Sequence, residues 1–494
     1  MKIFSNTGKR VEAWFLIIIS TVFFFLRFPS LFEPNWYGDE GIYQVLGLAM
    51  NQGRLLYRDI FDNKPPLLYF LYSLVNSDEF MIRLLSLVFG LFSVFAFFYL
   101  SKQIFKNLRV SFFSTALFAI LFGLPLIEGN IANAENFMLL PNIIAGILVL
   151  KSVDEKSQNK KYKILLLAGL VVGLSFLFKI VGIFDFAAFL VFLFFENYSK
   201  KLLDIFKREN IITEIKNVLP FMLGFILPIA LVTLVFIFNN AFSYFLKAIL
   251  FSNIGYVSYG NKLIIPQGLL ILKLIILSLF ALFIFYKRRV YDNGFVFASL
   301  WLAFSLFSAF FSQRPYTHYV LVLLPSVCLV LGLLFVNKNF SRISGVLAIS
   351  SFIIIVLSFN FYTKTIFYYQ NFVSFLSGKE NVTSYQKFFD GSTPRDYEIA
   401  SYVNLYAKKS DNIFIWGNNA QVYKLTDKLP PGRYAVAYHI TSYQDGLPNT
   451  KEALISKKPR FIIVMPNVAP YPFSLSNYFQ KLNINGVQIY EKLY

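Results

Sequence analysis

Long runs of apolar residues, separated by short polar and charged segments, fill the first 361 residues of the chain. The apolar residues do not alternate with polar ones, as they do in a half-exposed strand. A helix that crosses a membrane needs about 20 mostly apolar residues, with some tolerance for shorter runs. The pattern therefore predicts eleven membrane-spanning helices. In chain order, they cover residues 11–28, 80–100, 110–127, 137–150, 164–178, 181–195, 218–238, 265–286, 295–311, 319–336 and 343–361.

The adjacent runs 164–178 and 181–195 allow either one helix or two. One helix over both runs would be roughly 48 Å long at 1.5 Å per residue, whereas the hydrocarbon core of a bilayer is ~30 Å thick. Merging the runs would also move the basic segments that follow to the other side of the membrane. We therefore predict two short spans with a break at Lys179.

Composition agrees with a polytopic membrane protein, because 56% of the residues are hydrophobic and 15% are charged. The net charge of +19 would fit a nucleic-acid partner only if the basic residues were gathered on one soluble face. They lie between apolar runs instead, so we expect membrane lipids and no nucleic acid as partners. The single cysteine, Cys328, excludes disulfides and cysteine-based zinc sites within one chain.

The distribution of basic residues predicts the orientation. With the N-terminus inside, the segments 2–10, 102–109, 151–163, 200–216, 287–289 and 338–342 place 21 Lys and Arg in the cytoplasm, against seven in the external loops. Cytoplasmic loops carry an excess of Lys and Arg. We therefore predict a multi-pass protein of the cell membrane with a cytoplasmic N-terminus and an external C-terminal part. The first run lacks a small-residue cleavage site, and we expect it to be a retained anchor.

Residues 362–494 have the composition of a soluble domain. Helix-like stretches at 396–408 and 449–458 alternate with β-rich runs at 413–416, 434–440, 461–465 and 487–490. This alternation predicts a small α/β domain. The expected architecture is thus an all-α polytopic membrane domain, residues 1–361, followed by an external α/β domain, residues 362–494.

The longest predicted external loop follows the first span and concentrates charged residues. Asp39 and Glu40 are adjacent, and Arg58 and Lys64 follow some twenty residues later. Asp39 could simply cap a helix that begins near Gly41, with Glu40 favouring its positive end. The combination also suits transfer from a phosphate leaving group, because a carboxylate can accept a proton from a hydroxyl while cations neutralise the phosphate.

The loop also resembles a known family. The pattern GDEGxY at 38–43 and GxxxYRDxxDxKPPL at 53–67 is similar to the first external loop of protein O-mannosyltransferases and lipid A aminoarabinose transferases, which are GT-C glycosyltransferases. Glu135, just before the fourth span, and the segment RPYTHY at 314–319 extend the resemblance.

The resemblance implies a helical membrane core with interfacial helices in the first loop, and a polyprenyl-phosphate-linked sugar as the donor. It implies that Asp39 is the catalytic base, that Glu40 supports Asp39 or orients the acceptor, and that Lys64 contacts the carrier phosphate. The expected substrate-binding residues are Tyr57, Arg58, Lys64, Glu135, Arg314, His318 and Tyr319. Arg58 could instead be a snorkelling interfacial arginine, and His318 could be satisfied by the backbone.

Other features leave alternatives open. The acidic residues and the two histidines do not form a recognisable metal motif, so we predict no certain cofactor and leave a divalent metal open. The segments 416–423 and 430–434 could contact an acceptor glycan or form ordinary turns between strand and helix.

We expect a membrane glycosyltransferase that transfers one sugar, hexose or pentose, to an external lipid, polysaccharide or protein. The alternative is a lipid or oligosaccharide transporter, although transporters more often show internal repeats and broken helices at mid-membrane. A non-catalytic scaffold would leave the charged loop without a purpose.

Overall fold

The computed structural model describes residues 2–197, 208–336, 341–466 and 468–493. Lys200, Lys201, Lys207 and Lys338, which contribute to the predicted orientation, lie outside the described residues. Each of the eleven apolar runs forms helix. The helices are α1 (Lys2–Arg27), α4 (Glu79–Phe105), α5 (Leu108–Gly123), α6 (Ala134–Asp154), α7 (Gln158–Phe178), α8 (Gly182–Asn197), α9 (Arg208–Phe238), α12 (Gly268–Lys287), α13 (Asn293–Ala309), η5 (Thr317–Leu323) with α14 (Leu324–Leu333), and α15 (Ser341–Ser358).

Length and composition support a multi-pass membrane protein. In the described part of the chain, six helices are long and apolar enough to cross a membrane: α1, α4, α6, α7, α9 and α12. The apolar helices α5, α13, η5 with α14, and α15 are shorter. The number of crossings stays a prediction. The break near Lys179 is confirmed, because α7 ends at Phe178, Lys179 is extended with φ −154°, and α8 begins at Gly182.

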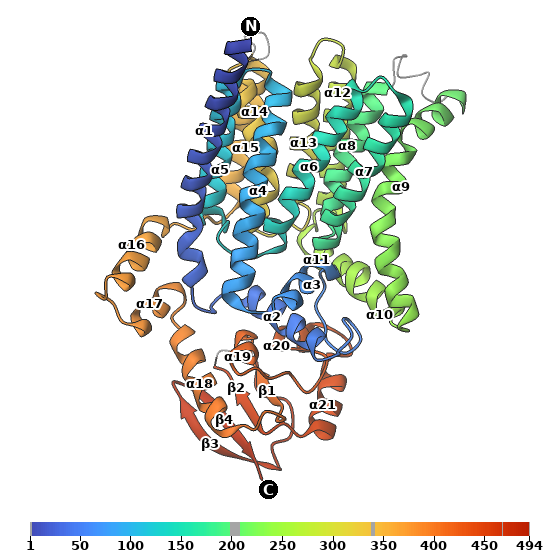
Figure 1. Ribbon diagram of the computed structural model, residues 1–494. Coiled ribbons are helices and arrows are strands. Elements are labelled where there is room, and N and C mark those ends of the chain that lie inside the picture. The colour runs from blue at the N-terminus through green and yellow to red at the C-terminus, as the bar shows by residue number, and fades with distance from the viewer. Residues whose placement is uncertain (1, 198–207, 337–340, 467, 494) are drawn as a thin grey trace. The chain divides into compact units, whose positions relative to one another are not determined.

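The chain folds into two compact units. The helical unit comprises residues 1–28, 85–235 and 251–365, and the sheet unit comprises residues 29–84, 236–250 and 366–494. In the helical unit, apolar helices run side by side (Figure 1). Its core is rich in Phe, as the parallel rings of Phe186 and Phe225 illustrate with centroids 4.0 Å apart. The division into domains at residue 361 stays a prediction.

Glycines allow α7 and α9 to approach closely within the helical unit. A Cβ atom on Gly169 would collide with the carbonyl oxygen of Phe221, and one on Gly224 would collide with that of Leu166. Small residues at such crossings let membrane helices pack backbone to backbone. Substituting either glycine by alanine would therefore push these two helices apart.

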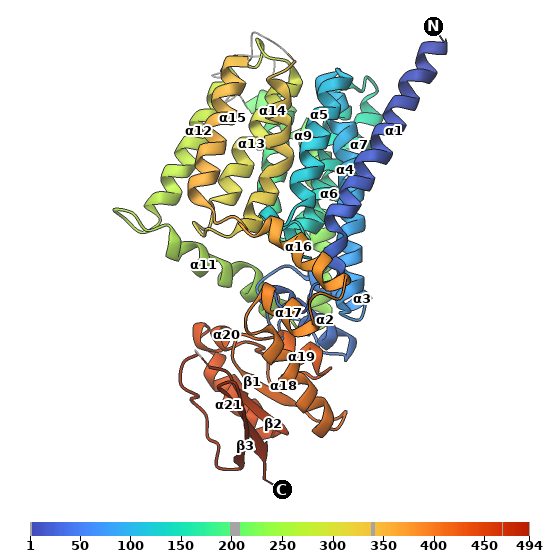
Figure 2. The same cartoon turned by 90° about the vertical axis from the view of Figure 1, so that its left-hand side faces the viewer.

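The sheet unit contains the predicted α/β domain together with the first loop. Its four-stranded sheet has the order β1-β2-β4-β3, with β1 (Ile413–Trp416) parallel to β2 (Phe461–Val464), and β4 (Val487–Lys492) antiparallel to β2 and β3 (Tyr478–Ile484). All four strands are labelled in Figure 1, and Figure 2 shows β1, β2 and β3 from another side. Asn485 and Gly486, with φ of 47° and 86°, form the turn between β3 and β4. The remaining helical elements of this unit are η1 (Phe28–Phe32), α2 (Gly38–Asn51), α3 (Pro66–Leu74), α10 (Phe242–Leu246), η4 (Lys247–Phe251), α16 (Thr365–Leu376), α17 (Val382–Phe389), α18 (Thr393–Tyr406), α19 (Gln421–Leu425), α20 (Ala437–Ser442) and α21 (Gly446–Lys457).

Most elements of the C-terminal part were predictable, but one prediction is wrong. The run 434–440 is not a strand, because Ala437–Ser442 forms the short helix α20. The N–H of Ala437 donates to the carbonyl of Gly417, 2.8 Å away, which fixes the start of α20 against the end of β1. Tertiary contacts here override the strand propensity of the aromatic and β-branched residues. Strand β3 was not predicted, since it is a mostly exposed edge strand of mixed composition.

Candidate functional site

The first loop folds into the helices α2 and α3. Helix α2 begins at Gly38 with Tyr37 at the N-cap position, so Asp39 lies inside the first turn and is not the N-cap residue. Its charge still complements the positive end of the helix. Helix α3 begins at Pro66 after Pro65, as the two prolines favour. Both helices belong to the sheet unit, as does every residue of the group described next.

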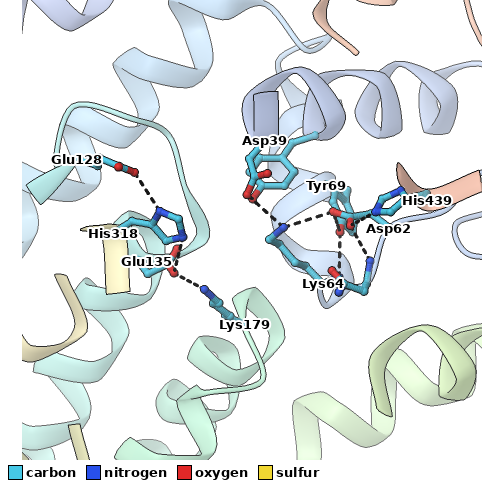
Figure 3. A network of polar contacts seen from close by, with 11 residues as sticks. Asp39, Asp62, Lys64, Tyr69, Glu128, Glu135, Lys179, His318 and His439 are labelled. Carbon is cyan, nitrogen blue, oxygen red and sulfur yellow. Dashed lines mark hydrogen bonds and ion pairs between the residues drawn. The ribbon is translucent and has the colours of Figure 1, made fainter. Parts of the chain in front are cut away.

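Side chains from α2, from the turn before α3, from α3 itself and from α20 form a polar group that we call the Asp39 cluster (Figure 3). Its members are Asp39, Tyr43, Asp62, Lys64, Tyr69 and His439. The Nζ atom of Lys64 lies 3.5 Å from Oδ2 of Asp39 and 3.6 Å from Oδ2 of Asp62. Tyr43 donates a hydrogen bond of 3.0 Å to the same Oδ2 of Asp39, and its ring lies under the Lys64 ammonium at 4.8 Å. The Asp39 side chain is 35% exposed, whereas Asp62 is buried.

The backbone of Lys64 is held on both sides. Its N–H donates to the hydroxyl oxygen of Tyr69 at 3.2 Å, and its carbonyl accepts from the hydroxyl of Tyr57 at 2.8 Å. Tyr57 is fully buried and has a left-handed φ of 66°, an uncommon conformation for a residue with a side chain. Burial raises the pKa of Tyr57, with a smaller contribution from Asp62, so its hydroxyl remains a donor. The predicted substrate residue Tyr57 thus contacts Lys64 and positions it.

Asp62 is the buried anchor of the cluster. Its Oδ2 accepts a hydrogen bond of 2.7 Å from Tyr69, and its Oδ1 accepts one of 2.8 Å from the N–H of Asn63. The Nε2 atom of His439, on α20, lies 3.8 Å from Oδ1 of Asp62. Burial lowers the pKa of His439 to about 4, against the opposing effect of Asp62, so the imidazole is neutral at physiological pH.

Glu40 belongs to a different arrangement from Asp39, although the two are adjacent. The guanidinium of Arg83, on α4, is fully buried and lies 2.8 Å from Oε2 of Glu40 and 2.9 Å from Oε1 of Glu79. It also donates to the backbone carbonyls of Glu33 and Pro34. A buried charge with this many partners fixes the start of α2 against α4. Glu40 therefore helps to hold the turn that carries Asp39.

A second polar group lies within the helical unit, and we call it the Glu135 cluster (Figure 3). It consists of Glu128, Glu135, Lys179, His318 and Tyr319. Glu135 is buried and forms an ion pair with Lys179, whose ammonium lies 4.2 Å above the Tyr319 ring. His318 lies between two carboxylates, with Nδ1 at 3.0 Å from Glu128 and Nε2 at 3.8 Å from Glu135.

The predicted site residues therefore fall into two groups, with Glu40, Arg58 and Arg314 outside both. Asp39, Tyr57 and Lys64 come together in one unit, and Glu135, His318 and Tyr319 come together in the other. Arg58 is half exposed and pairs with its neighbour Asp59 at 2.8 Å, and the hydrogen bond from Arg58 lowers the pKa of Asp59. Arg314 is partly buried in the segment that leads into η5.

Six members of the two clusters were not predicted as site residues: Tyr43, Asp62, Tyr69, Glu128, Lys179 and His439. Asp62 stands in the first-loop pattern, but its spacing from the prolines equally suggests a helix cap. Lys179 was recognised only as a break between two spans. Glu128 has a left-handed φ of 58°, which the sequence does not reveal. His439 lies 377 residues after Asp62, so no local pattern could link the two.

No group of three or more His, Cys, Asp or Glu side chains in the described ranges is arranged to hold a metal ion.

Comparison with known proteins confirms the resemblance found in the sequence. The model of the family described as dolichyl-phosphate-mannose-protein mannosyltransferase matches residues 63–209. This segment contains Lys64, Glu128, Glu135 and Lys179 but not Asp39. No curated protein sequence matches the chain.

Two solved structures are similar to the chain along nearly its whole length. ArnT from Cupriavidus metallidurans in the apo state is 14% identical, with a TM-score of 0.56 and coverage of 97% of this chain and 98% of that chain. ArnT from the same organism bound to undecaprenyl phosphate is 13% identical, with a TM-score of 0.54 and the same coverage. At such identities the likeness shows the fold, which is the GT-C fold. The family match and this fold support a membrane glycosyltransferase of the GT-C type.

Proposed function

We propose that the protein transfers one sugar from a polyprenyl-phosphate carrier to an acceptor on the external face of the membrane. The dolichyl-phosphate-mannose named in the family description and the undecaprenyl phosphate bound to ArnT both belong to the polyprenyl-phosphate class of carrier. The Lys64 ammonium beside the partly exposed Asp39 carboxylate is the observation that carries the proposal, because it combines a phosphate ligand with a base.

The reaction is a single displacement at the anomeric carbon. An acceptor hydroxyl oxygen attacks this carbon while Asp39 takes the hydroxyl proton. The bond between the anomeric carbon and the phosphate oxygen breaks, and its electron pair leaves with the polyprenyl phosphate. Lys64 neutralises the charge that develops on this oxygen. One displacement inverts the configuration at the anomeric carbon.

The buried partners explain why these two side chains would be effective. Tyr57 and Tyr69 hold the Lys64 backbone, and the Arg83 ion pairs hold the start of α2, so neither Lys64 nor Asp39 has to be reordered when substrate binds. Preorganised charge is usually the largest contribution to this kind of catalysis.

A transporter of lipid or oligosaccharide is the alternative. It would bind the same carrier and move it without breaking a bond. Charged residues of a transporter are expected near mid-membrane, and the ion pair of Lys64 lies instead in a segment between apolar helices.

The proposal is tested by incubating the purified full-length protein with a panel of polyprenyl-phosphate sugars and candidate acceptors. Release of free polyprenyl phosphate, measured by mass spectrometry, is the expected result. Binding of carrier lipid without any release, across the whole panel, would favour the transporter.

A further inference from the structure

The C-terminal part of the chain contributes side chains to the Asp39 cluster through α20. His439 is 3% exposed, and its ring lies 5.6 Å from that of Phe61, which precedes Asp62 in the chain. The ring of Tyr438 lies 4.3 Å from the His439 ring. These residues all belong to the sheet unit, so α20 is part of the surroundings of Asp62.

The segment after β1 holds α20 in this place. The N–H of Ala437 donates to the carbonyl of Gly417 at 2.8 Å, and the N–H of Tyr438 donates to the side-chain oxygen of Asn418 at 3.1 Å. Tyr434, which precedes α20, donates a hydrogen bond of 2.7 Å to Asp445, which follows α20 and comes directly before α21. The backbone of Tyr438 is thus fixed to the end of a buried strand.

Tyr438 differs from the neighbouring aromatic residues in its exposure. Trp416, Tyr423 and Tyr434 are each at most 2% exposed and belong to the core, whereas Tyr438 is 42% exposed. Gly417 and Asn418 therefore hold the start of α20, and Tyr438 is the exposed aromatic residue of this helix. Within the described part of the chain, its hydroxyl makes no hydrogen bond.

Tyr438 lies beside a member of the cluster, since its ring contacts that of His439 at 4.3 Å and Nε2 of His439 is 3.8 Å from Oδ1 of Asp62. Burial of the hydroxyl raises the pKa of Tyr438. The negative charges of Asp62 and Asp39 raise it further, and the positive charge of Lys64 lowers it. Tyr438 is thus 42% exposed and lies directly beside the buried His439. A large exposed aromatic surface beside a charged group is typical of a ligand contact.

We propose that Tyr438 binds the donor sugar, with the face of its ring packed against the C–H face of the sugar. This inference rests on the proposed function. The donor sugar is joined directly to the carrier phosphate, so a phosphate on Lys64 leaves the sugar within reach of the side chains around Lys64. The sugar carries hydroxyl groups that the Tyr438 hydroxyl can hydrogen-bond. The C-terminal part thereby completes the donor site.

The test compares two ligands that differ only in the sugar: polyprenyl-phosphate sugars of the panel and bare undecaprenyl phosphate. Binding to the full-length protein is measured for wild type, Tyr438→Ala, Tyr438→Phe and the control Tyr406→Ala. Tyr406 is 53% exposed on α18 and packs against Tyr402, so it matches Tyr438 in kind and exposure.

Tyr438→Ala is expected to weaken binding of the sugar-bearing lipid by about fivefold to tenfold. Its affinity for the bare carrier should stay unchanged, Tyr438→Phe should keep most of the affinity, and Tyr406→Ala should match wild type. An equal loss for both lipids, no loss for either, or a loss that affects only the acceptor KM would overturn the inference. If one of these outcomes is found and the wild-type protein still cleaves the donor, the proposed function stands and only the role of Tyr438 is wrong. If the wild-type protein binds only the bare carrier and cleaves no donor, both the proposed function and the role of Tyr438 are wrong.

Discussion

The ammonium group of Lys64 lies 3.5 Å from the carboxylate of Asp39, although 25 positions separate the two residues in the chain. The turn that ends in Pro65 and Pro66 brings Lys64 back to the start of α2. Tyr57, before the turn in the chain, and Tyr69, after it, each hydrogen-bond the backbone of Lys64. The pair is the centre of the proposed chemistry, because each member has a distinct part in breaking the bond to phosphate.

Replacing Lys64 tests the phosphate contact. Lys64→Ala should reduce affinity for polyprenyl phosphate and turnover by tenfold or more, as expected for loss of a charged hydrogen bond of about 1.5–3 kcal/mol. Lys64→Arg should restore only part, because the planar guanidinium does not replace a compact ammonium between two carboxylates. Lipid binding and donor turnover are both measured.

Lys379 offers a matched control, since it is exposed in the same unit. Lys379→Ala should behave as wild type. Agreement of wild type, Lys64→Arg and Lys64→Ala within about twofold, roughly 0.4 kcal/mol, would assign the phosphate contact to another cation.

Glu40 is expected to act through structure. Arg83→Met leaves the buried Glu40 and Glu79 without their cation and should lower the free energy of unfolding by about 3–5 kcal/mol. Glu40→Gln retains a hydrogen-bond acceptor for Arg83 and should keep turnover per folded molecule within about tenfold of wild type, below the 10²-fold loss typical of a removed base. Thermal unfolding and turnover are measured on the same preparations, and a 10³-fold loss in a fully stable Glu40→Gln protein would make Glu40 catalytic.

The neutral state of His439 predicts how stability depends on pH. Its pKa is about 4 when folded and about 6.5 when unfolded, so the unfolded state binds more protons between these values. This contribution to stability is present above about pH 6.5 and is lost as the pH falls toward 4, by up to about 3 kcal/mol. His439→Gln should flatten this part of the profile, measured by unfolding from pH 4 to 8. An unchanged slope would mean that His439 titrates normally.

The helices were largely predictable because a bilayer imposes a simple rule on apolar length. The break at Lys179 followed from the same rule, since one helix would be too long. The pattern around Asp39 and Lys64 was also visible, because its residues lie in one short loop. Its geometry still depended on Tyr57, whose left-handed backbone cannot be deduced from composition.

What the sequence did not predict depends on contacts between distant segments. His439 meets Asp62 only because α20 is fastened to the end of β1 through Gly417 and Asn418. The same contacts turn the expected strand at 434–440 into a helix. The ion pair between Glu135 and Lys179 likewise requires a tertiary arrangement, because it brings together residues that are 44 positions apart in the chain.

Orientation is tested by labelling single cysteines with a reagent that does not cross the membrane. The excess of Lys and Arg predicts labelling from outside at Gly38→Cys and Gly391→Cys, and none at Asn159→Cys. A Cβ at Gly38 or Gly391 meets no atom within 4 Å, and the native Cys328 is buried. Labelling of Asn159→Cys from outside, with protection of the other two, would reverse the proposed topology.

The most direct test of the proposed mechanism is donor turnover by Asp39→Asn. The asparagine keeps the size of the side chain and an acceptor for Tyr43, but it cannot take a proton from the acceptor hydroxyl. Release of polyprenyl phosphate should fall by about 10²- to 10⁴-fold, with carrier-lipid binding retained. Turnover close to that of wild type in a folded Asp39→Asn protein would contradict the assignment of Asp39 as the base.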